Sequence, residues 1–224
     1  MTDPVTPENY DPEGLERRLE QLPAEGRPAI VVLRREYAET AEHVWDALTT
    51  PARIPRWFAP IEGDLRVGGR YQVQGNASGE ILACERPNRI LMTWESPGQD
   101  VPPSELQLRL EPAAGGAATT LELRHSAEVP AEFWTSFGPG AVGVGWDLSF
   151  LGLALHLSNP EAEHAVEDDE AFAVSEDGIR IIEVSSAAWA RASMEAGTPA
   201  EDAVAAGGRT TAFYTGRPDP DAAE

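Results

Sequence analysis

The sequence predicts an α+β domain in which a curved antiparallel sheet of six or seven strands packs on a long apolar helix. Two observations carry this prediction. Apolar and polar residues alternate in short runs from residue 65 to residue 123, which is typical of strands with one buried face. Residues 141–157 are apolar nearly all round and too few to cross a bilayer, so we expect a buried helix covered by the sheet.

The chain is expected to enter this domain through one strand and two short helices. Residues 30–37 are β-branched at the start and predict a strand. Thr40 is the expected N-cap of the first helix, whose apolar residues share one stripe. Thr50 is the expected N-cap of the second, with Pro51 at the first helical position, where a missing N–H costs nothing.

The following strands are expected to form a meander. Turn-forming residues separate the alternating runs at 75–79, 87–88, 97–103 and 115–116. Successive strands joined by such short connections pair as antiparallel neighbours. The predicted sheet therefore has one dry and one wet face.

Charge and composition divide the chain into five parts. Five of the six Trp fall in 30–157, which is the expected packed domain. A Pro-rich leader, partly disordered or helical, precedes it (1–29). An acidic linker (158–170), a helical tail (171–216) and a disordered end (217–224) follow it. The tail is too apolar for a solvated linker, so we expect it to dock on the core or on a second subunit, which would give a homodimer through these helices.

The composition excludes several classes of function. The chain has 38 acidic and 17 basic residues, for a net charge of −21, and its basic residues are all Arg. Nucleic acid and anionic membranes are therefore unsuitable partners, and lysine Schiff-base chemistry is impossible. Cys84 is the single cysteine and no signal peptide is apparent, so a cytoplasmic location is expected. The four His have no metal-ligand spacing, and neither a metal nor a cofactor is expected.

A series of motifs in 30–157 resembles the SRPBCC superfamily and, more closely, the bacterial group related to the activator of the heat-shock chaperone ATPase (Aha type). The motifs are REYAETAEHVWDALTTPARIPRWFAP, GDLRVGGRYQV, GEILACERPNRILMTWE, ATTLELRH and GWDLSFLGLAL. The resemblance implies a START-like helix-grip fold, in which the sheet wraps the last helix and often leaves a ligand cavity between them. Members of the group often read Gly-Trp-His near the start of that helix, where this chain has Gly145-Trp146-Asp147. No role of that His carries over.

Two titratable residues are candidates for chemistry in such a cavity. The alternation of Leu121 and Leu123 places His125 inward, as a general base, a ligand-orienting group, or a strand-end side chain bonded to a backbone carbonyl. Asp147 either faces the cavity, where burial would raise its pKa, or lies in the first turns of the helix facing solvent.

Other side chains follow from the same alternation. Arg35 is expected inward, where a buried guanidinium needs an acidic partner such as Asp147 or Glu85. Aromatic side chains are candidates for the cavity lining, with Trp134 and Phe137 in a lid at its mouth. The ligand-binding candidates, besides His125, are Trp57, Phe58, Tyr71, Trp94, Trp134, Phe137, Trp146 and Phe150.

Three functions are compatible with these features. The first is binding of a small hydrophobic or aromatic ligand between the sheet and the long helix, without catalysis. The second is a cyclase- or lyase-type enzyme that uses His125 or Asp147 for proton transfer in the same cavity. The third is an acidic, co-chaperone-like module that binds another protein.

Overall fold

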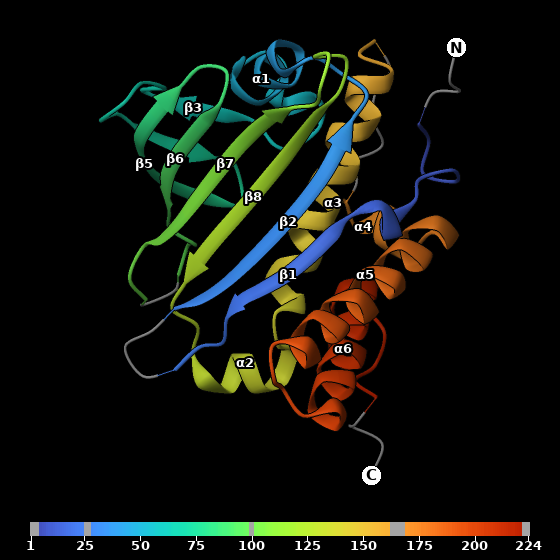
Figure 1. Cartoon of the computed structure of the whole chain (residues 1–224). Helices are drawn as coiled ribbons and strands as arrows, with labels where there is room; N and C mark the ends of the chain where they lie inside the picture. The colour runs from blue at the N-terminus through green and yellow to red at the C-terminus, as the bar shows by residue number, and fades with distance from the viewer. Residues whose placement is uncertain (1–4, 25–27, 99–100, 162–168, 221–224) are drawn as a thin grey trace.

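The protein is an α+β helix-grip domain with a C-terminal helical tail (Figure 1). The computed structural model describes residues 5–24, 28–98, 101–161 and 169–220. Within these residues, eight strands form one antiparallel sheet in the order β1-β2-β8-β7-β6-β5-β4-β3. The strands are β1 (Glu16–Gln21), β2 (Ala29–Tyr37), β3 (Ile61–Gly63), β4 (Arg70–Val73), β5 (Ala77–Glu85), β6 (Arg89–Trp94), β7 (Ser104–Pro112) and β8 (Thr119–Ala127).

The helices lie on one side of the sheet and at its ends. α1 (Ala41–Thr49) begins at Thr40, whose side chain accepts from the backbone N–H of His43. The second expected helix is the short 3-10 turn η2 (Ile54–Arg56). The others are η1 (Pro12–Gly14), α2 (Ala131–Phe137), α3 (Gly140–Ser158), α4 (Asp169–Val174), α5 (Glu176–Glu195) and α6 (Ala200–Thr215).

The leader differs from the sequence prediction. It contains β1, which pairs with β2, so the sheet gains an edge strand and the domain begins before residue 30. Only Leu19 is buried within β1, and a single apolar residue gives no alternating pattern. The strand is held instead by its ladder with β2 and by α5 alongside.

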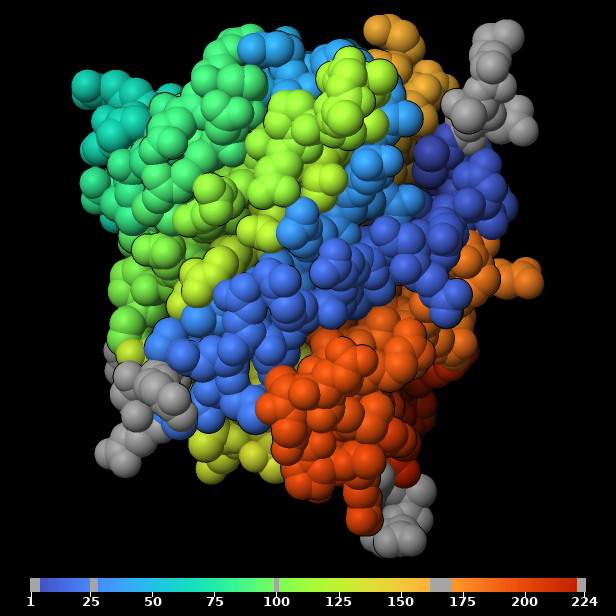
Figure 2. Space-filling view, viewed as in Figure 1, coloured from blue at the N-terminus to red at the C-terminus, as the bar shows by residue number. Residues whose placement is uncertain are grey.

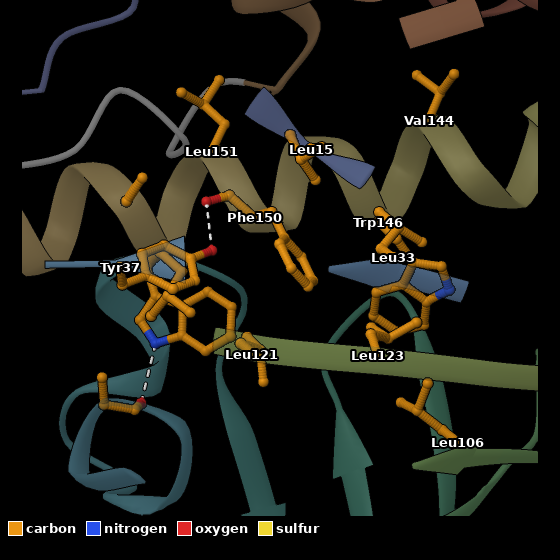
Figure 3. Packing of buried hydrophobic residues seen from close by; sticks show 14 of the residues in the cluster. Leu15, Leu33, Tyr37, Leu106, Leu121, Leu123, Val144, Trp146, Phe150 and Leu151 are labelled. Atoms are coloured by element: carbon orange, nitrogen blue, oxygen red, sulfur yellow. Dashed lines mark hydrogen bonds between the residues drawn. The ribbon is translucent and has the colours of Figure 1, made fainter. Parts of the chain in front are cut away.

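α3 is the central helix, and it is buried on several sides. It is long and apolar enough to cross a membrane by length and composition, but two-thirds of it lies inside the protein. Figure 3 shows Trp146 and Phe150 pointing from α3 toward Leu121 and Leu123 of the sheet, whereas Val144 points away. The sheet thus covers one face of α3 and the tail covers another.

The tail packs on the same chain. α5 contacts both α3 and β1, and α6 packs on α5, so the tail runs along the β1 edge of the sheet (Figures 1 and 2). Gly143 makes the close approach possible, because a Cβ there would lie 2.2 Å from Cε2 of Trp189. The tail's apolar face, including fully buried Ile181, Ile182 and Trp189, is therefore covered without a second subunit. Covering β1 also shields an edge strand from pairing with another chain.

Candidate functional site

A small apolar cavity of about 100 Å³ lies between the sheet and α3. Strands β4, β6, β7 and β8 form its floor, α3 its roof and the segment around η2 one wall. Aromatic rings make up much of the lining. Six of the predicted ligand-binding residues meet here: Trp57, Phe58, Tyr71, Trp94, Trp146 and Phe150.

The aromatic rings of this cavity contact one another and leave few polar atoms inside it. Trp94 and Trp146 meet edge to face with ring centroids 5.1 Å apart, and Phe58 lies 6.4 Å from Trp94. The Tyr71 hydroxyl donates to the carbonyl of Thr93 at 2.7 Å, and the Trp57 indole donates to the carbonyl of Ala47 at 3.0 Å. Because these polar tips are bonded to backbone, the cavity presents carbon to whatever fills it.

A larger cleft of about 670 Å³ adjoins this cavity at the end of the sheet near α2. Its walls come from the ends of β4 to β8, from the Pro-rich stretch before β7, and from α2 and α3. Trp94 lines both spaces and therefore stands between them. The polar part of its lining includes Gln72, Glu95, Ser96, Ser104, His125 and Glu128.

His125 belongs to a directed chain of hydrogen bonds beside Trp94. The Trp146 indole N–H donates to Nδ1 of His125 at 3.1 Å, so the imidazole proton resides on Nε2. Nε2 lies 2.8 Å from the Ser104 hydroxyl, which in turn donates to the carbonyl of Trp94 at 2.8 Å. Burial lowers the pKa of His125 to about 4, so the ring is neutral at physiological pH.

This arrangement makes His125 a poor base. The lone pair on Nδ1 already accepts a hydrogen bond from Trp146, and the proton on Nε2 is directed to Ser104. The hydrogen-bond partners of the ring are the side chains of Trp146 and Ser104. The expectation that His125 is bonded to a backbone carbonyl at the strand end is therefore wrong. The His125 ring instead holds the side chains of Trp146 and Ser104 in place at the junction of the cavity and the cleft.

Asp147 lies away from both spaces, on the face of α3 that meets β1 and α5. Its Oδ2 accepts from Nε of Arg17 at 2.9 Å, with both side chains almost completely buried. Burial raises the pKa of Asp147 to about 6, although Arg17, Ser185 and Trp189 act in the opposite direction. Within the described chain, Oδ1 of Asp147, Oγ of Ser185 and Nε1 of Trp189 form no regular hydrogen bond. The ion pair of Asp147 with Arg17 thus joins β1 to α3.

The partner predicted for Arg35 is also different. Its guanidinium lies 4.4 Å above the ring of Tyr10 and donates to the carbonyl of Asp11, both in the leader. Arg17, which no motif singled out, pairs with Asp147 instead.

Trp134 and Phe137 are not brought to the cavity or the cleft. They line a separate groove of about 490 Å³ between α2 and the tail helices. The side chain of α2 that borders the cleft is Phe133. The expected lid position is thus held by another aromatic residue of the same helix.

Two residues were not predicted from the sequence, one in the cleft and one beside Asp147. Ser104 shares the alternation of inward-facing Leu106 and Leu110, so a signal for it existed. Arg17 stands in a polar run with no apolar alternation, and nothing in the sequence indicated its burial. Across the described residues, no group of three or more potential metal ligands occurs.

Comparison with known proteins places this geometry among solved structures. Residues 38–158 match the family model described as Activator of Hsp90 ATPase homolog 1-like protein. The crystal structure of CalU16 from Micromonospora echinospora shares 32% identity over 80% of this chain and 96% of that chain, with a TM-score of 0.58. Its solution structure shares 33% identity over 81% and 96%, with a TM-score of 0.64.

A third structure extends the likeness in fold. DynU16, described as a protein of the dynemicin biosynthetic locus, shares 23% identity over 58% of this chain and 48% of its own, with a TM-score of 0.52. At that identity the likeness concerns the fold alone. No curated protein matches the sequence.

Proposed function

The chain belongs to the family of Activator of Hsp90 ATPase homolog 1-like proteins, within the SRPBCC superfamily, and from its cavity we propose that it binds a small hydrophobic or aromatic ligand. The observation that carries the proposal is the position of Trp94 between the apolar cavity and the cleft. We also propose a cytoplasmic location, in keeping with the sequence.

The sizes of the two spaces define how a ligand would sit. Pockets for drug-sized ligands measure roughly 300–1,000 Å³, a range that contains the cleft of about 670 Å³ but not the cavity of about 100 Å³. The body of the ligand would occupy the cleft, and an apolar group would pass Trp94 into the cavity. Movement of the Trp94 and Trp146 rings would enlarge the inner space.

Binding without catalysis suits the placement of the titratable groups. Proton transfer requires an acid or base within hydrogen-bond reach of the reacting atom. The lone pair of His125 is used by Trp146, and Asp147 points to the opposite side of α3. The cyclase- or lyase-type reaction considered from the sequence would therefore need a different residue.

Titration with Nile red, a neutral dye that brightens in apolar surroundings, tests the proposal. The wild-type protein should bind one dye per chain. Val142 of α3 lines the cleft, so Val142→Trp should place an indole inside it and weaken dye binding at least about tenfold, which corresponds to about 1.4 kcal/mol. Val204→Trp, at an exposed position of α6, is the matched control and should bind like wild type. Equal titrations for both variants would overturn the proposal.

A second candidate, protein binding, is favoured by an exposed aromatic row. Phe133 and Phe137 of α2 lie 5.2 Å apart, and Phe137 lies 5.5 Å from Phe213 of α6. Phe213 is 63% exposed, and such clustered apolar surface marks interaction sites. An Hsp90-type chaperone is the partner that the family description suggests. Sedimentation with a purified Hsp90 should show a complex that Phe213→Ser weakens; identical sedimentation of both forms would remove this candidate.

A further inference from the structure

We infer that the cleft accepts aromatic ligands that are neutral or cationic and carry a hydroxyl or amino donor, and that it rejects organic acids. This inference rests on the proposed ligand-binding function and specifies the ligand class. It comes from the charges and the free hydrogen-bonding positions of the cleft.

The described lining of the cleft contains two carboxylates and no cation. Glu95 is paired with Arg70 at 2.8 Å, but Arg70 is not itself part of the lining. Glu128 follows β8 at the exposed rim, and no ion pair involves it within the described residues. His125 is neutral, because its burial disfavours the charged ring.

An anionic group entering this space would lose water without gaining a positive partner. Burying a charge is costly unless it is paired, and the carboxylate of Glu128, which has no ion-pair partner among the described residues, adds repulsion. The net charge of −21 acts in the same direction at longer range. A protonated amine would instead be attracted by these negative charges.

Two side chains of the cleft have an acceptor oxygen available to a ligand, because their own N–H and O–H groups already donate to backbone carbonyls. The amide nitrogen of Gln72 donates to the carbonyls of Val73 and Ala77, both at 3.0 Å, which leaves Oε1 for a ligand. Ser104 accepts from His125 and donates to the carbonyl of Trp94, so only a lone pair of its oxygen remains. Both positions favour a ligand O–H or N–H.

Neutral donors in the cleft are compatible with this selectivity. The Ser96 hydroxyl and the Trp94 indole N–H form no hydrogen bonds with other described residues. They can bond to a carbonyl or ether oxygen of a ligand. Neither carries the charge needed to offset a carboxylate.

Displacement of Nile red by four naphthalene probes tests the inference. The probes are 1-naphthylmethylamine (a cation), 1-naphthalenemethanol (a neutral donor), 1-methylnaphthalene (neutral, without a donor) and 1-naphthoic acid (an anion). The amine and the alcohol should displace the dye at concentrations at least about tenfold below the acid, which corresponds to about 1.4 kcal/mol. The donorless hydrocarbon should fall between the alcohol and the acid.

Reversing one rim charge gives a gain-of-function test. Glu128→Arg should improve displacement by the acid at least about threefold and weaken the amine, since a cation then faces the cleft. Glu195→Arg, at the exposed end of α5, changes the net charge equally and should leave both unchanged. If the acid competes as well as the amine, or if no probe displaces bound dye, the inference is wrong while the ligand site stands. If Nile red itself does not bind, the proposed function fails first.

Discussion

The indole nitrogen of Trp146 lies 3.1 Å from Nδ1 of His125 and donates a hydrogen bond to it. An indole nitrogen is only a donor, so this contact fixes the imidazole as the neutral tautomer with its proton on Nε2. The N–H at Nε2 donates to the hydroxyl oxygen of Ser104, and that hydroxyl donates in turn to the carbonyl of Trp94. Helix α3 and strands β6, β7 and β8 are thereby joined where the cavity meets the cleft.

His125 should stay neutral down to low pH. Its pKa is lowered to about 4 in the folded protein by burial, whereas an unfolded His titrates near 6.5. The unfolded chain therefore binds more protons between these values, and the stabilising contribution is complete above pH 6.5 and is lost as the pH falls toward 4. The loss amounts to at most about 3 kcal/mol, since a tenfold change in proton affinity is worth about 1.4 kcal/mol.

Nitrogen chemical shifts of the His125 ring measure its protonation state and tautomer directly. They should report an Nε2–H tautomer that persists from pH 8 to pH 5. Trp146→Phe removes the donor to Nδ1 and should allow the second tautomer to appear. A doubly protonated ring above pH 6 in the wild-type protein would contradict the prediction.

Asp147 should produce the opposite pH dependence. Burial raises its pKa to about 6 in the folded state, against about 3.9 in an unfolded chain, so the folded protein binds the extra proton between these values. The free energy of unfolding should therefore fall as the pH rises from 4 to 6, by at most about 3 kcal/mol from this group. Denaturant unfolding of wild type and Asp147→Asn isolates the effect, and a pH-independent difference between them would refute it.

The buried pair of Arg17 and Asp147 should be strongly coupled. Arg17→Met leaves a buried carboxylate without its cation and should cost about 3–5 kcal/mol, while Arg17→Met with Asp147→Leu should recover most of that loss. The exposed pair of Arg66 and Asp64 is the control, and Arg66→Met should cost at most about 0.5 kcal/mol. The double-mutant cycle is measured by urea unfolding. Additive effects at the buried pair would show that the two charges act separately.

Adjacent residues of α3 illustrate how far sequence reasoning reached. The apolar run predicted the helix and its burial, and the alternation in β8 placed His125 inward, because both follow from periodicity. Trp146 and Asp147 face different neighbours, one the cavity and one the Arg17 side chain of β1. The run is apolar all round, so its pattern did not reveal which face meets which neighbour.

The parts that escaped prediction depend on contacts distant in the sequence. β1 is held by its ladder with β2 and by α5, with little apolar pattern of its own. Trp134 and Phe137 turn toward the tail because α6 packs on α2. The aromatic wall of the cavity was predictable, since most of its residues lie in strands and helices with regular periodicity.

The close contact of Gly143 with Trp189 should decide whether the tail stays docked. A methyl group at 143 would lie 2.2 Å from Cε2 of Trp189, an indole packed rigidly in the core, so Gly143→Ala should force α5 away from α3. Overpacking of this kind costs roughly 1–3 kcal/mol, even though Ala favours a helix over Gly by about 1 kcal/mol. Gly208→Ala, at an exposed position of α6 with ordinary contacts, should raise stability by up to about 1 kcal/mol. Thermal unfolding, followed by the near-ultraviolet circular dichroism of the Trp residues, compares the stability of the two variants. A Gly143→Ala protein as stable as Gly208→Ala would mean that α5 can shift on α3 without loss.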